Sequence, residues 1–292
     1  MKEGVIIKGI GGFYDVLDDN KVVRCKPRGR FRKLGITPMV GDRVLYTPET
    51  QGSEGALEEI LPRKNTLIRP SITNIDNLAV VAAAAHPAPD LLLIDKLMIS
   101  AERMGISVLL IINKIDLAEP DELDALKSQY TPTGYPIFCV SGKFGQGIEE
   151  LSKAMKGITT LAGQSGVGKS TIINNLHPGK ELETGNVSKK IKRGRHTTRH
   201  VELLILPYGG MVADTPGFSQ IGLLDFEPIE LQESYPEFEQ YRRDCYFNGC
   251  MHISEPGCRV RQAVEDGCVS EGRFERYVHI IEEIKENRRN LW

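Results

Sequence analysis

The sequence Gly-Gln-Ser-Gly-Val-Gly-Lys-Ser at residues 163–170 constrains the fold of this chain more than any other stretch. It fits the phosphate-binding pattern G-x-x-x-x-G-K-[ST] at every defined position. A strand-like segment at 159–162 precedes it, and a helix-like segment from Thr171 follows. The glycines let backbone N–H groups surround phosphate oxygens, and the N-terminus of the helix adds partial positive charge. We therefore expect a nucleotide site rather than a chance Gly-rich turn.

Two side chains of this loop have expected chemical roles. Lys169 is expected to reach the β- and γ-phosphates and to act in catalysis, and the Ser170 hydroxyl is expected to bind Mg²⁺. The residues expected to contact the nucleotide here are Gly163, Gln164, Ser165, Gly166, Val167, Gly168, Lys169, Ser170 and Thr171.

A second motif, at residues 113–116, predicts which base is bound. It consists of Asn113, Lys114, Ile115 and Asp116, directly after a strand-like run at 106–112. The Asp116 carboxylate can accept hydrogen bonds from both N1–H and N2–H₂ of guanine, whereas adenine offers no such pair of donors. Asn113 is expected to bond the other edge of the base or to tie loops together, and the Lys114 stem to cover the face of the base. Alone, this tetrapeptide is equally consistent with an exposed turn.

A third motif also follows a strand-like run. Ser141, Gly142 and Lys143 fit the loop whose backbone N–H contacts the guanine O6, although Ser-Gly-Lys is also a common turn. Together, the three motifs predict a site for GTP and GDP.

Two further segments are expected to respond to the γ-phosphate. Thr197 or Thr198, in the basic stretch 193–200, is expected to place a hydroxyl on Mg²⁺. Asp214 is expected to hold Mg²⁺ through water, and the Gly217 N–H to contact the γ-phosphate. Loops that gain contacts only while this phosphate is present form a switch.

The order of the motifs is unusual. From about residue 70, β-like and α-like segments alternate, which predicts a mostly parallel sheet with ligands at the strand ends. Familiar GTPases place the phosphate loop before the Asn-Lys-x-Asp motif, whereas this chain places it after. A circular permutation explains the order, because domain termini tend to lie close together.

Residues 1–65 contain short β-rich runs separated by turn formers, which predict a small barrel of the oligonucleotide-binding (OB) type. A basic run without acidic residues lies within it. Its members are Arg24, Lys26, Arg28, Arg30, Arg32 and Lys33. With Phe31 stacking on a base, this run favours nucleic-acid binding; the alternative is a solvated charged loop.

Near the C-terminus, four potential metal ligands are clustered in sequence. They are Cys245, Cys250, His252 and Cys258. Three thiolates and one imidazole suit tetrahedral zinc; the alternative is three structural cysteines and a surface histidine. The spacing of Phe274, Tyr277, Val278, Ile281 and Ile284 predicts an amphipathic final helix whose stripe is core.

The composition sets further bounds. The chain has 292 residues, of which 40% are hydrophobic and 26% charged, with a net charge of −2, so any polyanionic partner must be bound by local patches. The first residues lack the apolar core of a signal peptide, and the apolar runs are shorter than a membrane span. We expect a cytoplasmic protein with no membrane partner.

The permuted order, the Gly-Arg-His-Thr-Thr-Arg-His stretch at 194–200, the barrel and the Cys/His cluster together resemble the ribosome small-subunit-dependent GTPase A family, also called circularly permuted YjeQ-type GTPases. The resemblance covers essentially the whole chain. It implies a GTPase that acts late in small ribosomal subunit maturation and is stimulated by that subunit. It also suggests that His196 orients the attacking water, since Phe218 stands where Ras-like enzymes have glutamine. A histidine that only contacts RNA is the alternative.

We therefore expect a multidomain, monomeric protein. An all-β OB-type barrel is expected at 1–67, a circularly permuted α/β P-loop GTPase domain at 68–221, and a mainly α zinc-binding domain at 222–292. The expected cofactors are GTP/GDP, Mg²⁺ and Zn²⁺, and the expected partner is the small ribosomal subunit with its rRNA. Gly166, at the fourth position of the phosphate loop, argues against K⁺ dependence. The alternatives are an RNA-binding scaffold with a scarcely hydrolytic nucleotide site, or a GTPase with another RNA or metabolic target.

Overall fold

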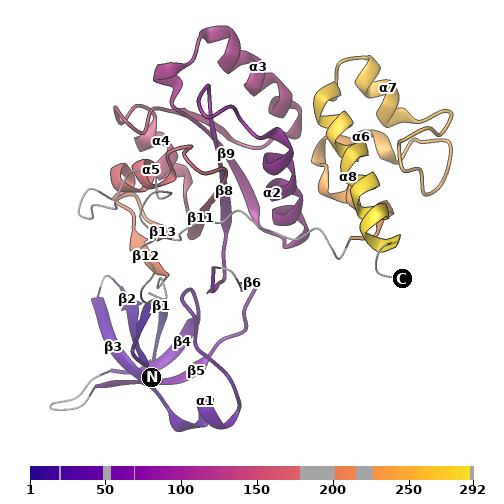
Figure 1. The fold of residues 1–292 in the computed structure, drawn as a ribbon. Helices are drawn as coiled ribbons and strands as arrows, with labels where there is room; N and C mark the ends of the chain where they lie inside the picture. Colours follow the sequence, from indigo (N-terminus) through magenta and orange to yellow (C-terminus); the bar gives the residue numbers. More distant parts are fainter. Residues whose placement is uncertain (20, 49–53, 69, 178–200, 215–225, 290–292) are drawn as a thin grey trace, which may run out of the picture. The chain divides into compact units, whose positions relative to one another are not determined.

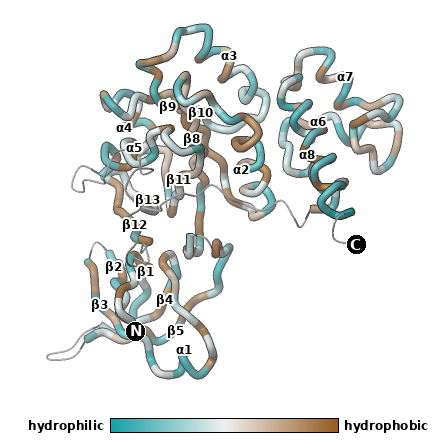
Figure 2. Tube along the Cα trace, in the orientation of Figure 1, coloured by the Kyte–Doolittle hydropathy of each residue, from teal (hydrophilic) through white to brown (hydrophobic). Residues whose placement is uncertain are grey.

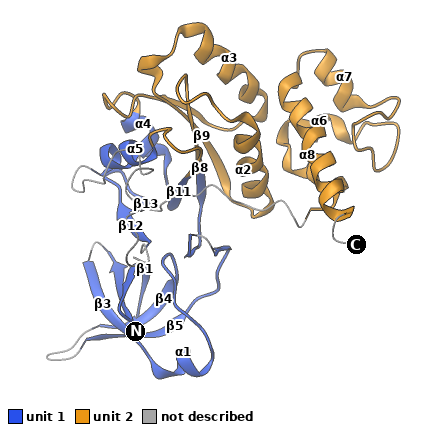
Figure 3. Ribbon diagram, in the orientation of Figure 1, with its two compact units in different colours: residues 1–78, 148–161, 169–218 blue, residues 79–147, 162–168, 219–292 orange. Residues whose placement is uncertain are grey.

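The computed structural model describes residues 1–19, 21–48, 54–68, 70–177, 201–214 and 226–289 (Figure 1). The chain forms two compact units, each assembled from separate stretches of sequence (Figure 3). The first comprises residues 1–78, 148–161 and 169–218. The second comprises residues 79–147, 162–168 and 219–292.

The first unit begins with a closed five-stranded barrel. Its strands are β1 (Lys2–Ile10), β2 (Phe13–Asp18), β3 (Lys21–Pro27), β4 (Arg43–Thr47) and β5 (Gly55–Ile60). β1 pairs antiparallel with both β2 and β4, β2 pairs antiparallel with β3, and β5 closes the ring by pairing with β3 and β4. Ile6, Val16 and Leu57 point inward and are fully buried. The predicted OB-type barrel is confirmed.

The basic run does not lie as the sequence suggests. Residues Gly29–Lys33 form a short helix, α1, which turns the Phe31 ring into the barrel core, where it is 5% exposed. The expectation that Phe31 stacks on a base is therefore wrong. Instead, the half-buried ring of Phe13 lies beneath the cations of Arg24 and Lys26, at 4.9 and 5.6 Å.

The remaining elements of the first unit include a second group of strands and two helices. They are β6 (Thr66–Leu67), β7 (Ile72–Thr73), α4 (Ile148–Ala154), β11 (Ile158–Ala162), α5 (Lys169–Leu176), β12 (Glu202–Ile205) and β13 (Met211–Asp214). β13 pairs parallel with β11 and antiparallel with β12. β12 also pairs with the barrel strand β1, where Lys8 lies opposite Glu202 and their side chains form an ion pair at 2.9 Å.

The second unit contains three neighbouring strands in the order β10-β9-β8, of which β10 and β9 pair parallel. Its elements are β8 (Asn77–Ala83), α2 (Leu91–Arg103), β9 (Ser107–Asn113), η1 (Ile115–Leu117), α3 (Pro120–Tyr130), η2 (Thr131–Thr133) and β10 (Ile137–Val140). Hydrophobic residues run along β8 and β9 without alternation, as expected for strands covered on both faces (Figure 2). Asp90 caps α2 by accepting a hydrogen bond from the Leu93 N–H at 3.0 Å, and Gly105 (φ +63°) ends the helix region.

The C-terminal part of the second unit is helical, as predicted. Its elements are η3 (Pro228–Ser234), η4 (Pro236–Phe238), α6 (Glu239–Arg242), α7 (Arg259–Glu265) and α8 (Glu271–Arg289). The predicted stripe of α8 is core: Tyr277, Ile281 and Ile284 are buried, and Phe274 and Val278 pack against the same cluster. None of the helices in the described ranges is both long and apolar enough to cross a membrane.

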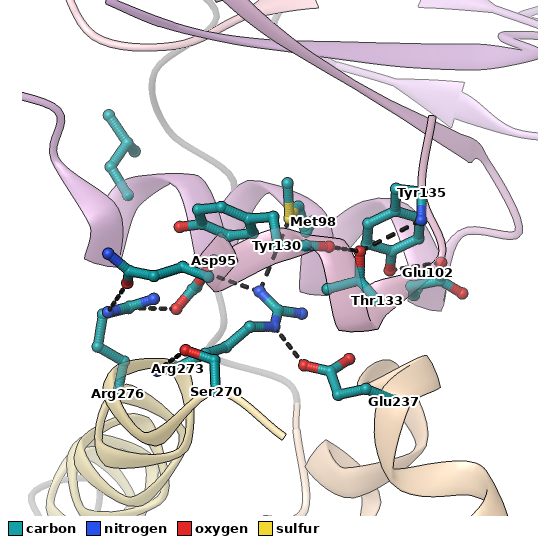
Figure 4. A network of polar contacts seen from close by, with 12 residues as sticks. Asp95, Met98, Glu102, Tyr130, Thr133, Tyr135, Glu237, Ser270, Arg273 and Arg276 are labelled. Carbon is teal, nitrogen blue, oxygen red and sulfur yellow. Dashed lines mark hydrogen bonds and ion pairs between the residues drawn. The ribbon is translucent and has the colours of Figure 1, made fainter. Parts of the chain in front are cut away.

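A buried ion-pair network joins this helical region to α2 and α3 within the second unit (Figure 4). Arg273 of α8 donates to Asp95 of α2 at 2.7 Å and to Glu237 of η4. Arg276 donates to the other Asp95 oxygen at 2.5 Å and to Gln129 of α3 at 3.1 Å. Burial alone would lower the pKa of Arg273, but the charges of Glu237 and Asp95 outweigh it and raise that pKa. Arg273 is therefore a cation at neutral pH.

Candidate nucleotide site and metal cluster

At two positions of the phosphate loop, both the backbone angle and the neighbouring atoms require glycine. Gly163 has φ +142°, and a Cβ there would lie 2.2 Å from the Val81 carbonyl oxygen. Gly168 has φ +97°, and a Cβ there would lie 2.3 Å from Asn113 Nδ2. The chain enters α5 at Lys169, so the loop leads directly into a helix N-terminus, where N–H groups bind anions.

Asn113 links the phosphate loop to the guanine-type motifs. Its amide is 2% exposed, and its Nδ2 donates to the Val167 carbonyl at 2.8 Å. Its Oδ1 accepts a hydrogen bond from the Gly142 N–H, also at 2.8 Å. Of the two roles expected for Asn113, these contacts match the tie between loops. One side chain thus holds the phosphate loop, the end of β9 and the turn after β10 together.

Asp116 and Lys114 are held by separate contacts. The Ser141 hydroxyl donates to Asp116 Oδ1 at 2.6 Å, which leaves the other carboxylate oxygen for further donors. Lys114 adopts a left-handed backbone (φ +63°), and its ammonium donates to the His86 carbonyl at 2.7 Å. Ile115 begins η1, and Lys143 lies over the Phe144 ring at 4.9 Å.

The charge of the phosphate loop is suited to an anion. Burial lowers the pKa of Lys169, because the ammonium loses water around it. A bound phosphate would supply the opposite charge and reverse that effect. Ser170 and Thr171 follow in the first turn of α5, and Gln164 and Ser165 lie within the loop.

Several expected site residues fall outside the part of the chain that the structure describes. They are His196, Thr197, Thr198 and Gly217. Asp214 is the last residue of β13, which pairs with β11, the strand that leads into the phosphate loop.

The structure brings Cys245, Cys250, His252 and Cys258 together, with their ligand atoms within 4.8 Å of one another. Cys245 Sγ lies 4.0 Å from Cys258 Sγ, and His252 Nδ1 lies 3.6 and 3.3 Å from these two atoms. Tetrahedral zinc with bonds of ~2.3 Å to sulfur and ~2.0 Å to nitrogen places its ligands about 3.5–3.8 Å apart. The four residues therefore fit zinc.

The surroundings of the cluster also favour a cation. The Arg259 and Arg261 N–H groups donate to the Cys245 and Cys258 sulfurs at 3.4 Å, which stabilises thiolates. Burial, together with neighbouring thiols, raises the pKa of Cys250 to about 12, so this thiol needs a bound cation to ionise at neutral pH. Burial lowers the pKa of His252 to about 4, so its imidazole is neutral and able to ligate.

Sequence reasoning missed two residues that support these sites: His86, whose carbonyl holds Lys114, and Gln232, which contacts His252. Neither belongs to a motif, and each is distant in sequence from its partner, so no local signal identifies it.

A phosphate loop held against an Asn-Lys-x-Asp loop and a Ser-Gly-Lys turn defines a guanine-nucleotide-binding P-loop protein. The RsgA GTPase family matches residues 60–224, and the RsgA N-terminal domain matches residues 3–57. The chain belongs to the RsgA GTPase family and is a GTPase. The resemblance seen in the motifs is thereby confirmed.

Relatives match over nearly the whole chain. A "Small ribosomal subunit biogenesis GTPase RsgA" from Ruminiclostridium cellulolyticum is 47% identical over 98% of this chain and 95% of its own length. The protein of the same name from Carboxydothermus hydrogenoformans is 46% identical over 99% of both chains.

Two solved structures share the fold. The crystal structure of YjeQ from Thermotoga maritima has a TM-score of 0.82 at 36% identity, over 97% of this chain and 98% of that one. The structure of YloQ, described as a circularly permuted GTPase, has a TM-score of 0.83 at 38% identity, over 98% of this chain and 96% of that one.

Proposed function

We propose that this protein hydrolyses GTP in the late maturation of the small ribosomal subunit, binding rRNA in its GTP state and leaving after hydrolysis. The main support for GTP binding is the pair of Asn113 hydrogen bonds, which joins the phosphate loop to the loop proposed to select the base. The names of the relatives, both small ribosomal subunit biogenesis GTPases, support the biological role.

Within this proposal, Asp116 accepts N1–H and N2–H₂ of guanine, and the Lys114 stem covers the base. The Gly142 region contacts the guanine O6, with Ser141 orienting Asp116 and Lys143 completing the turn. Residues 163–168 surround the phosphates, Lys169 neutralises the β- and γ-phosphates, and Ser170 and Asp214 hold Mg²⁺. The 2.6 Å bond from Ser141 supports this, because it fixes the carboxylate before the base arrives.

We assign the water-orienting role to His196, a magnesium contact to Thr198 or Thr197, and a γ-phosphate contact to Gly217. These assignments rest on the motifs alone. Mg²⁺ would neutralise charge on the phosphates, and His196 would orient the attacking water.

The Cys/His cluster is proposed to bind one zinc ion through three thiolates and His252 Nδ1. Its role would be structural, because four protein ligands leave no open position for chemistry. The distances and the N–H groups aimed at sulfur support the assignment.

The functional parts are proposed to be the barrel at 1–67, the GTPase domain at 68–221 and the zinc-binding domain at 222–292. The barrel would contact rRNA through Arg24 and Lys26 of β3, whose cations lie over the ring of Phe13 on the neighbouring strand β2. Five basic residues of the switch region would add phosphate contacts: Lys189, Lys190, Lys192, Arg193 and Arg195. We expect a cytoplasmic monomer.

The test is phosphate release at many turnovers, measured with and without small ribosomal subunits. We expect the protein alone to release phosphate slowly and the small subunit to stimulate this release strongly. His196→Ala should lose both the slow release and the stimulation. The matched control is His279→Ala, on the exposed side of α8. Subunit binding without stimulation would favour the RNA-binding scaffold instead, and failure to bind the subunit would favour another target.

A further inference from the structure

Gln232 lies behind the Cys/His cluster, although it is outside the stretch 245–258 that supplies the ligands. It belongs to η3, and its Oε1 lies 2.9 Å from His252 Nε2. The other ring nitrogen, Nδ1, faces the sulfurs of Cys258 and Cys245 at 3.3 and 3.6 Å. One edge of the imidazole therefore faces the ligands, and the opposite edge faces Gln232.

The remaining contacts of the Gln232 amide fix its orientation. Its Nε2 donates to the carbonyl oxygens of Ile229 at 3.0 Å and Cys250 at 3.4 Å. Carbonyl oxygens only accept hydrogen bonds, so the NH₂ group must face them and Oε1 must face His252. Because Oε1 also only accepts, His252 Nε2 carries the proton. The lone pair of Nδ1 is then directed at the sulfurs.

Burial makes this hydrogen bond necessary. His252 is fully buried, and its ring contacts the edge-on ring of Phe238 and the tilted ring of Tyr277. In the described part of the chain, Gln232 is the acceptor found for the Nε2–H group. An unpaired buried N–H costs free energy, so removal of the acceptor would favour the other tautomer or another ring orientation. The other tautomer would protonate Nδ1, and another ring orientation would point it away from the sulfurs. Either change would prevent Nδ1 from binding a metal.

We propose that Gln232 is the positioning residue of the zinc site: it holds His252 in the Nε2–H tautomer and aims Nδ1 at the metal. The inference rests on the zinc site proposed above. Outer contacts of this kind commonly change metal affinity by about 10- to 100-fold. Because Gln232 also bonds the Cys250 carbonyl, it ties η3 to the ligand-bearing loop. Zinc binding is thereby linked to the order of η3, which lies at the start of the described C-terminal region.

The experiment compares the full-length protein with three variants by competition for Zn²⁺ against a chromogenic chelator. Gln232→Leu removes the acceptor at similar volume, and we expect zinc binding about 10- to 100-fold weaker. Gln232→Glu keeps an acceptor and is expected to retain or strengthen binding. Gln262→Leu is the matched control, since Gln262 is exposed on α7 and bonds Asp266, and we expect no change.

Two readouts separate positioning from general destabilisation. Long-range ¹H–¹⁵N NMR of the zinc-loaded wild type should show a metal-bound Nδ1 and a protonated Nε2 in His252. Hydrogen exchange of residues 229–234 should accelerate when zinc is removed from the wild type and, with zinc bound, in Gln232→Leu. Equal zinc affinity of Gln232→Leu and wild type, or a protonated Nδ1, would overturn the role of Gln232. A wild type that binds no Zn²⁺ would instead overturn the zinc site itself.

Discussion

Replacing Arg273 with alanine tests the buried network that joins α8 to α2. The Arg273 side chain is 1% exposed, and its partners Asp95 and Glu237 are 0% and 2% exposed. Its guanidinium also lies over the rings of Tyr235 and Tyr130, at 4.7 and 5.5 Å. The substitution therefore removes a desolvated charge and the packing of its stem at once.

The structure indicates which charge is left unpaired. Asp95 keeps Arg276 at 2.5 Å, so Glu237 is the group that loses its counterion. Breaking a buried pair by removing one partner costs about 3–5 kcal/mol. Because only one of the two carboxylates is orphaned, we expect the lower end, about 3 kcal/mol, which corresponds to about a 100-fold change in an equilibrium constant.

Native-state hydrogen exchange of the buried α8 amides, from Tyr277 to Ile284, measures this loss. We expect about 100-fold faster exchange in Arg273→Ala. Arg288→Ala is the control, since Arg288 pairs with Glu227 at the surface and its loss should cost about 0–1 kcal/mol. Adding Glu237→Gln to Arg273→Ala should recover part of the protection, because it removes the orphaned charge. If Arg273→Ala and Arg288→Ala gave similar exchange, the network would contribute little and the reasoning would be refuted.

Three further predictions concern the nucleotide site and the barrel. Asp116→Asn should weaken GTP binding about 100-fold, because the negative charge is lost and an NH₂ donor replaces one of the two acceptor oxygens that face the guanine N–H groups. Nucleotide titration checks this against Asp121→Asn on the exposed face of α3, and equal affinities would contradict the base-selecting role. Gly168→Ala should weaken nucleotide binding at least about tenfold, since its Cβ would displace Asn113 and open the loop. Gly105→Ala is the control, because Gly105 also has a positive φ but a Cβ there would contact nothing. The Tyr46 hydroxyl donates to Asp18 at 2.6 Å and lowers the pKa of Asp18 below its ordinary 3.8. A carboxyl with a lowered pKa stabilises the fold above its unfolded pKa and loses that effect as the pH falls. Tyr46→Phe should therefore lower the urea midpoint of the barrel at pH 7, and the difference from wild type should close as the pH is lowered through and beyond 3.8; a difference that persisted in acid would exclude this hydrogen bond as its cause.

Local signals predicted the elements that carry the nucleotide motifs. The strand Ile137–Val140 ends directly before Ser141, and the helix Leu91–Arg103 lies between its capping residue Asp90 and Gly105. These elements have continuous apolar runs and strong end signals, which do not depend on distant partners. The phosphate loop was similarly evident because its glycines and lysine are dictated by short-range geometry.

The features that sequence reasoning missed depend on contacts made by the folded chain. β5 contains Glu58 and Glu59, which weaken the strand pattern, and only its pairing with β3 and β4 makes it part of the barrel. Phe31 is flanked by cations, yet a single helical turn points it into the core. Gln232 precedes His252 by 20 positions, so its hydrogen bond follows from tertiary packing alone.

The pairing of β1 with β12 connects the barrel through backbone hydrogen bonds to the strand pair β12–β13 of the first unit. β12 begins just after the stretch that carries His196, and its neighbour β13 ends at Asp214. Because Glu202 pairs with Asp214, the two segments expected to sense the γ-phosphate adjoin the same end of this strand pair. A load applied to the barrel at β1 would reach that end of the strand pair through the backbone hydrogen bonds between β1 and β12.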